Sequence, residues 1–246
     1  MDHTDAPAPV GPAPLGPART DEAPAPHSRA AQKERTRRAL LDAALGLLAE
    51  QSLSGLGLRE VTRAAGIAPT AFYRHFRDIP DLGVALVDET LGSLHQVVRA
   101  LLAAGASAED RIADAVALIA AHVRAYPAHV RFIARERHGG VRAVREATDR
   151  ELRNFSYEVA EGLAAQPEST GWTVGDIQML AELYVDLLLL TATSLLETEP
   201  GTEAERAVLT GAERKLRVVA LGRRHWREDR QDRQDRQDRQ NGGLTP

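Results

Sequence analysis

The side chains with the clearest chemical potential lie in one short stretch, PTAFYRHFR, at residues 69–77. Three of the eight Phe and Tyr rings of the chain fall within residues 72–76, and two arginines and a histidine accompany them. Phenol, guanidinium and imidazole groups donate hydrogen bonds to phosphate oxygens, whereas small side chains allow close approach to base edges. The stretch therefore indicates a surface that contacts nucleic acid.

The flanking sequence predicts the helices that position this stretch. Leucine and alanine recur at spacings of three and four over residues 33–50, which is typical of a helix with one buried face. A second helix is expected over 58–65, ended by Gly66, where a left-handed backbone costs little. Pro69 suits the first turn of a third helix over 69–76. Two short helices joined by a glycine-containing turn predict a helix-turn-helix.

The third helix is expected to bury one side against the core and to present the other side to DNA. Phe72 and Phe76 are four residues apart and point to a common core. Tyr73 and His75 then project outward, on a helix that fits the major groove of B-DNA. The alternative is an ordinary solvated basic face, since short helix pairs recur in many all-α proteins.

The charge of one segment supports contact with nucleic acid, whereas the net charge of the whole chain does not. Residues 29–80 hold nine Lys and Arg against five Asp and Glu, although the formal net charge of the chain is −4. Cysteine is absent, which excludes disulfides and thiolate metal sites. The longest uncharged stretch within the leucine-rich segment, 187–196, is too short to span a bilayer. We expect a cytoplasmic, nucleoid-associated protein.

Composition divides the chain into four parts, with an all-α fold throughout the ordered ones. Residues 1–28 contain seven of the thirteen prolines and are expected to form a disordered arm. Residues 29–80 form the helix-turn-helix domain and 81–226 a second helical domain. Residues 227–246 form a low-complexity tail, and its DRQ repeats at 229–240 favour a solvated tail over a continuing helix, because they offer no apolar side chain that could pack against the domain. The further helices are expected near 80–103, 107–126, 128–137, 141–165, 173–197 and 203–226.

The run AGIAPTAFYRHFRDIPDL, residues 65–82, resembles the helix-turn-helix signature of TetR-family transcriptional regulators. The resemblance covers 29–82 in order and spacing, whereas the later helices are similar to the variable domain of that family in length and number only. More narrowly, residues 58–89 resemble the FabR/DesT branch, which regulates unsaturated fatty-acid synthesis. The segment RFIARERHGG at 131–140 is similar to that branch too. The resemblance implies a TetR-like fold with an N-terminal DNA-binding domain and a C-terminal effector-binding and dimerisation domain.

By position, the resemblance implies which residues contact DNA. They are Arg37, Arg59, Pro69, Thr70, Ala71, Tyr73, Arg74 and His75. It also implies a homodimer through the last two helices that binds a palindromic double-stranded operator. Gly57 and Ala68 depart from the family, which often has Thr and Ser as helix caps there. Those two hydroxyl contacts with phosphate are therefore not expected.

The resemblance also implies a repressor that responds to a hydrophobic effector such as a long-chain acyl-CoA. The candidates for contact with the acyl chain are Phe132, Leu183, Leu187 and Leu190, and those for a basic opening are Arg131, Arg135 and Arg137. Plain core packing and surface ion pairs are the alternatives for these residues. A second alternative is a repressor of an efflux or catabolic gene that responds to an unrelated hydrophobic molecule. Whether ligand releases or strengthens DNA binding is left open.

No cofactor or metal site is expected. The histidines at 95, 122, 129 and 138 are scattered over predicted helices without carboxylate partners, and no phosphate loop or catalytic triad pattern is present. An enzyme and an effector-free DNA-binding protein are the remote alternatives. We expect ligand to change how the helix beginning near Pro80 packs, and so to change the separation of two recognition helices.

Overall fold

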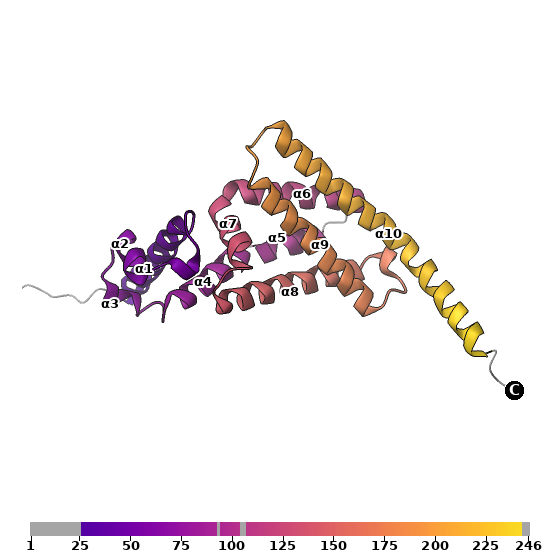
Figure 1. Ribbon diagram of the computed structural model, residues 1–246, viewed down its shortest axis with the longest axis horizontal. Coiled ribbons are helices and arrows are strands. Elements are labelled where there is room, and N and C mark those ends of the chain that lie inside the picture. The colour runs from indigo at the N-terminus through magenta and orange to yellow at the C-terminus, as the bar shows by residue number, and fades with distance from the viewer. Residues whose placement is uncertain (1–25, 93, 104–106, 243–246) are drawn as a thin grey trace, which may run out of the picture. The chain divides into compact units, whose positions relative to one another are not determined.

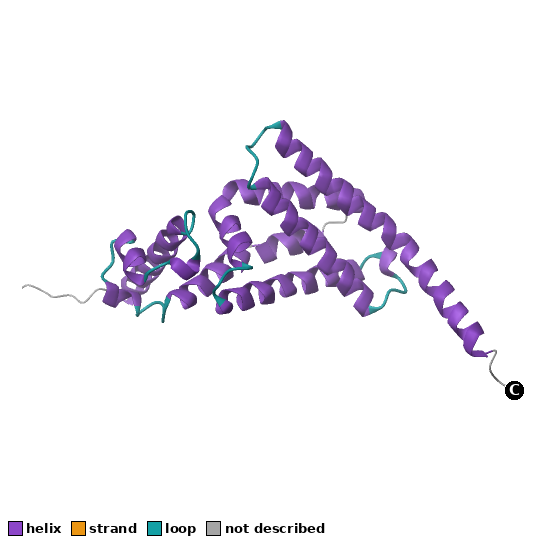
Figure 2. Cartoon of the chain, viewed as in Figure 1, coloured by secondary structure: helices purple, strands orange, loops and turns teal. Residues whose placement is uncertain are grey.

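The structure is a computed structural model that describes residues 26–92, 94–103 and 107–242 (Figure 1). Within these residues it contains helices and no strand (Figure 2), so the all-α prediction is confirmed. The α-helices are α1 (Pro26–Leu47), α2 (Leu58–Ala64), α3 (Pro69–Phe72), α4 (Ile79–Gly92), α5 (Leu94–Ala103), α6 (Ala108–Ala125), α7 (Pro127–Glu136), α8 (Arg142–Ala164), α9 (Val174–Leu195) and α10 (Glu203–Gly242), with short 3₁₀ turns η1 (Leu53–Gly55) and η2 (Pro167–Ser169).

Contacts divide the chain into two compact units, residues 1–35 and 36–246. Most of the predicted arm of residues 1–28 lies outside the described residues, and α1 begins at its end. Within the first unit, the Arg35 guanidinium donates to Oε1 of Gln32 at 2.6 Å. All the features below belong to the second unit.

The turn between α2 and α3 has the predicted conformation. Gly66 has φ 67, in the left-handed region that favours glycine. Gly57 and Ala68 stand at the two N-cap positions with extended backbones and no side-chain cap, and Pro69 begins α3. The α-helical part of the third helix ends at Phe72, earlier than predicted. After Phe72 the backbone contains hydrogen bonds between residues three apart, such as that from the His75 N–H to the Phe72 carbonyl oxygen at 2.9 Å, which are typical of a 3₁₀ turn.

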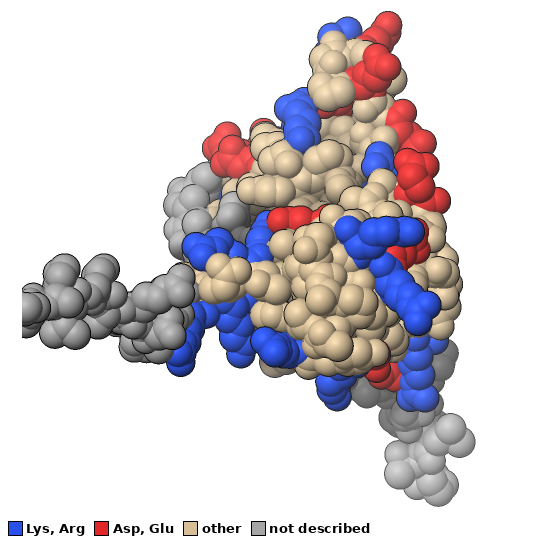
Figure 3. Space-filling model, turned by 90° about the vertical axis from the view of Figure 1, so that its left-hand side faces the viewer, with Lys and Arg blue, Asp and Glu red and all other residues tan. Residues whose placement is uncertain are grey.

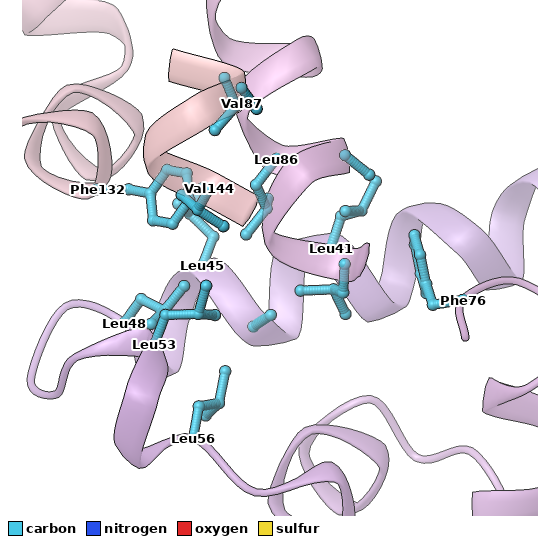
Figure 4. Close-up of a cluster of buried hydrophobic side chains, with 14 of the residues drawn as sticks. Leu41, Leu45, Leu48, Leu53, Leu56, Phe76, Leu86, Val87, Phe132 and Val144 are labelled. Carbon is cyan, nitrogen blue, oxygen red and sulfur yellow. The ribbon is translucent and has the colours of Figure 1, made fainter. Parts of the chain in front are cut away.

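The core of the helix-turn-helix region is continuous with that of the following helices (Figure 4). Leucines of α1 and Leu53 of η1 pack against Leu86 of α4, Phe132 of α7 and Val144 of α8. Gly83 permits this junction, since a Cβ there would overlap Leu53 and lie 2.8 Å from Cγ2 of Val144. Burial of these side chains against one another fixes the helix-turn-helix to the body.

Three charged side chains hold the link between α3 and α4. The Arg77 guanidinium donates to Oδ1 of Asp81 at 2.7 Å, and the Arg77 backbone N–H donates to Oδ2 at 2.9 Å. The Asp81 N–H in turn donates to Asp78 Oδ1 at 2.8 Å, which satisfies a free donor of the first turn of α4. The hydrogen bonds from Arg77 lower the pKa of Asp81. The link is therefore a defined structure rather than a loose hinge.

The remaining helices form a bundle in which α8 packs on α4, α5 and α9, and α10 packs on α6 and α9. Hydroxyl caps start two of them, with Ser107 Oγ accepting from Asp110 N at 3.1 Å and Thr173 Oγ1 from Asp176 N at 3.2 Å. The segment expected as one helix near 80–103 is described as α4 and α5, with residue 93 outside the described residues. None of the described helices is long and apolar enough to cross a membrane.

The last helix differs from the favoured prediction. Its backbone is helical to Gly242, so the helix runs through the DRQ repeats rather than ending near 226. Asp and Arg recur there at spacings of four, which supports a solvated helix.

Candidate nucleic-acid interface and ligand cavity

The third helix is anchored and exposed as its sequence predicts. Phe72 and Phe76 are buried, with ring centroids 5.6 Å apart. Pro69 and Thr70 at its start are exposed, Ala71 is half-buried, and Tyr73 presents 64% of its surface to solvent. Burial of the two phenylalanines on one side thus leaves a small-residue end and a phenol free to approach a groove.

The basic residues around α3 fall into two groups. Arg59 of α2 and Arg74 are exposed. Arg37 and His75 are half-buried, with the Arg37 guanidinium carbon 4.6 Å from the Phe76 ring centroid. The prediction that His75 projects outward like Tyr73 is therefore only partly met, because its ring lies 6.5 Å from that of Phe76.

One exposed arginine near α3 escaped the sequence-based selection. Arg63 lies in the last turn of α2, four residues after Arg59, so the two share a helix face. The signal that could have found it is this spacing within a basic segment. Seen from the end that carries α2 and α3, Lys and Arg side chains border a broad surface of uncharged residues (Figure 3). Positive charge around such a surface supplies sequence-independent attraction to phosphates.

A cavity of about 260 Å³ lies among α4 to α10. Its wall is mainly leucine, isoleucine and valine from seven helices, joined by Phe155 of α8. Val130 and Ile133 of α7 and Thr90 and Leu91 of α4 also line the cavity. A largely apolar cavity with few polar groups is the usual form of a small-molecule site.

Three polar side chains in this wall have shifted pKa values. Burial, followed by the charge of His129, lowers the pKa of His122, so the imidazole is neutral at physiological pH. Its Nε2 is buried and has no hydrogen-bond partner among the described residues. Burial also raises the pKa of Tyr184 and lowers that of Arg223.

The seven residues predicted to contact an effector lie outside this wall. Phe132 is buried in the core shared with the helix-turn-helix region, Leu183 and Leu190 are exposed, and Leu187 packs against Leu216 and its neighbours. These residues share α7 and α9 with the cavity wall but lie outside that wall.

The arginines of α7 have structural contacts in place of a basic opening. Arg135 Nη1 donates to the carbonyl oxygens of Leu48 and Gln51, both at 2.9 Å, where α1 ends. Arg137 lies 3.7 Å from Asp186 of α9, whereas Arg131 is half-buried. Capping of the last carbonyls of a helix by arginine stabilises its C-terminus.

The expectation that the four histidines lack carboxylate partners is wrong for His95. Its Nδ1 lies 2.9 Å from Glu158 and its Nε2 3.2 Å from Glu151, and its ring stacks on Phe155 at 4.1 Å. Both carboxylates come from α8, more than fifty residues away, so local spacing could not reveal them. No group of three or more metal-binding side chains occurs among the described residues.

A family model described as bacterial regulatory proteins of the tetR family matches residues 40–86, which include the C-terminal part of α1, all of α2 and α3, and the first part of α4. Residues 40–86 of this chain are therefore similar to the TetR family of bacterial regulatory proteins. The matched residues contain both the buried phenylalanines and the exposed Tyr73. In helix-turn-helix proteins the second helix of the motif lies in the major groove of DNA, and α3 is the corresponding helix here.

Solved structures share the TetR-like fold over most of the chain. The fatty acid degradation regulator FadR from Bacillus halodurans is 16% identical, with a TM-score of 0.61 over 74% of this chain and 94% of that chain. FadR from Bacillus subtilis in complex with stearoyl-CoA is 16% identical, with a TM-score of 0.61 over 73% and 96%. NalD from Pseudomonas aeruginosa, the secondary repressor of the MexAB-OprM multidrug efflux pump, is 22% identical, with a TM-score of 0.57 over 78% and 97%.

Tyr73→Phe is expected to weaken binding to specific and non-specific DNA alike, by about 1–2 kcal/mol. The reason is the loss of a phenol that donates to a phosphate oxygen while the ring remains. Fluorescence anisotropy with both DNAs measures the effect. Tyr157→Phe, at another exposed tyrosine on α8, is the matched control and should leave both affinities unchanged. Unchanged DNA affinity in Tyr73→Phe would remove the phenol from the interface.

Proposed function

We propose that the protein is a ligand-responsive repressor in which the apolar cavity controls the DNA-binding surface. The observation that carries the proposal is the span of α4. Its first turn is joined to α3 through Arg77 and Asp81, and Thr90 and Leu91 near its end line the cavity. A ligand that alters the packing of α4 thereby alters the orientation of the recognition helix.

Helix α7 offers a second connection between the same two places. Val130 and Ile133 line the cavity, while Arg135 bonds to the end of α1 and Glu136 Oε1 accepts from the Leu53 N–H at 2.9 Å. These four residues lie within two turns of one helix, which moves as a rigid element. A ligand that displaces α7 at the cavity wall would therefore also move the contacts that α7 makes with α1 and η1.

The proposed homodimer forms through α9 and α10. Met179, Leu183 and Leu190 lie along one stripe of α9 and are exposed, the last to 53%. On α10, Val218 is 68% exposed and Leu221 is exposed beside it. An exposed apolar patch on two neighbouring helices is typical of an interface. A second copy of the chain is the occupant we propose, because two recognition helices double the contacts with a palindromic operator.

Charges placed in the stripe are expected to separate the subunits. Leu190→Glu and Val218→Glu should each raise the dimer dissociation constant about tenfold or more, because a carboxylate would be buried against its symmetry mate. Sedimentation equilibrium measures the constant. Val174→Glu is the matched control, since Val174 is 86% exposed in the first turn of α9 and faces away from the stripe. Equal effects of all three variants would contradict the proposed interface.

A hydrophobic effector is supported by the apolar cavity wall, and a long-chain acyl-CoA is the specific proposal for it. The structural likeness to a FadR in complex with stearoyl-CoA supports this proposal, as does the resemblance of residues 58–89 to the FabR/DesT branch. Genes of fatty-acid or lipid metabolism are the corresponding targets. The likeness to NalD supports the alternative of an efflux repressor with an unrelated hydrophobic effector.

Selection of bound sequences from a random DNA pool tests the repressor proposal. We expect a palindromic motif with two half-sites, and a change in affinity for it when acyl-CoAs of varied chain length and unsaturation are added. Enrichment of no motif would contradict the regulator itself. Enrichment with a response only to unrelated hydrophobic molecules would favour the efflux alternative.

A further inference from the structure

One end of the cavity is charged, in contrast to its apolar body. Three guanidinium groups reach the wall there, from Arg111 of α6 and Arg217 and Arg223 of α10, together with the carboxylates of Glu109 and Glu168. Arg217 lies 3.9 Å from Glu109 and forms a long ion pair with it. The guanidinium groups therefore outnumber the carboxylates at this end of the cavity.

Arg223 is the most enclosed of these cations, because only 8% of its surface is exposed. Its two terminal nitrogens donate to neutral acceptors, Nη1 to Gln166 Oε1 at 2.9 Å and Nη2 to Ser169 Oγ. Its Nε is buried and has no acceptor among the described residues. Glu168 is near enough to raise the pKa of Arg223, but the two form no ion pair within the described part of the chain.

A buried cation without a carboxylate partner is unusual and costly. Charged side chains are almost never fully buried unless they are paired, because transfer of an ion from water into the interior is unfavourable. Burial lowers the pKa of Arg223 accordingly, and Arg111 lowers it further. Tyr184 is close enough to both arginines that their charges lower its pKa, against the larger effect of its own burial. An anion at this end would supply the missing charge and the missing acceptor together.

We propose that Arg223, with Arg111 and Tyr184 beside it, binds the carboxylate head of a single-chain amphiphile whose apolar tail occupies the body of the cavity. The inference rests on the proposed function, since it concerns the effector of that same cavity. It names a free carboxylate as the head group in place of the thioester of an acyl-CoA, because a thioester carries no charge for Arg223 to bind. The cavity volume of about 260 Å³ is near the lower end for ligand pockets and suits one acyl chain. Guanidinium groups bind carboxylates with charge-assisted hydrogen bonds, which provide selectivity for the head group.

Calorimetric titration of the full chain with dodecanoate and with dodecanol tests the proposal, since the two probes share a chain and differ in the head. The wild-type protein should prefer the carboxylate roughly 10- to 100-fold. Arg223→Met should reduce that preference to about onefold while dodecanol still binds, which also shows that the variant is folded. Arg223→Lys should retain an intermediate preference. Arg214→Met, at an exposed arginine of the same helix, should leave the preference unchanged.

Equal binding of the two probes to the wild-type protein would overturn the assignment, as would an unaltered preference in Arg223→Met. Absence of binding by either probe would also overturn it. Fluorescence anisotropy with the selected operator DNA, measured without ligand, shows whether only the role of Arg223 is wrong or the proposed repressor function is wrong as well. Intact operator binding together with absent head-group selectivity contradicts only the role of Arg223, whereas loss of operator binding in the wild-type protein contradicts the repressor.

Discussion

Exchange of Phe72 for alanine is expected to lower the free energy of unfolding by about 3–5 kcal/mol, the usual cost of removing a buried aromatic ring. Phe72 is fully buried, with Phe76 and the helices of the DNA-binding region around it. The cavity left behind would release α3, so operator affinity should fall with stability. Thermal denaturation followed by circular dichroism measures the first effect, and anisotropy measures the second.

Tyr73→Ala is the matched control for this exchange, because Tyr73 is the adjacent ring and is exposed. It should change stability by less than about 0.5 kcal/mol and still weaken DNA binding. Two adjacent residues are thus expected to have different roles, since Phe72 anchors α3 to the core and Tyr73 contacts DNA. A Phe72→Ala variant as stable as the wild-type protein would show that α3 is held by other contacts.

Exchange of Glu136 for leucine should destabilise the junction between α7 and η1 by about 1–3 kcal/mol, because the buried Leu53 N–H loses its acceptor. Any effect of a cavity ligand on DNA affinity should shrink at the same time, since α7 loses one of its attachments to the DNA-binding region. Chemical denaturation measures stability, and operator titrations with and without acyl-CoA measure the coupling.

Glu136→Gln retains an oxygen at the position that accepts from Leu53 and should recover most of the lost stability and coupling. Glu146→Leu, at an exposed carboxylate of α8 that pairs with Arg142, is a control for the loss of a glutamate as such. If leucine and glutamine behaved alike at position 136, the hydrogen bond to Leu53 would be unimportant for both effects.

Local signals predicted most of the fold. Gly66, Pro69 and Pro127 act through their own backbone preferences, so their effects on helix ends can be recognised without knowledge of the tertiary structure. The spacing of Phe72 and Phe76 likewise predicted which side of the third helix is buried. The end of α10 was harder to predict, because the DRQ repeats favour no buried face and the choice between helix and solvated tail has no apolar signal.

The ligand cavity could not be predicted in the same way, because α9 is apolar on several sides. Its second half contains four consecutive leucines at 187–190, so the pattern does not distinguish Leu188 and Leu189, which line the cavity, from Leu190, which is exposed. Arg223 carries no local signal either. Its significance comes from Gln166 and Ser169, more than fifty residues earlier in the chain, which approach it only in the folded protein.

Helix α10 has a place in both the cavity and the exposed apolar surface. Leu216 and Arg223 point into the protein, while Val218 faces outward between them along the same helix. In the proposed dimer, a rotation of α10 on ligand binding would change the packing of the two subunits against each other at the twofold axis. Occupancy of the first site then changes the affinity of the second, and a saturation curve for the two sites should show a Hill coefficient different from one.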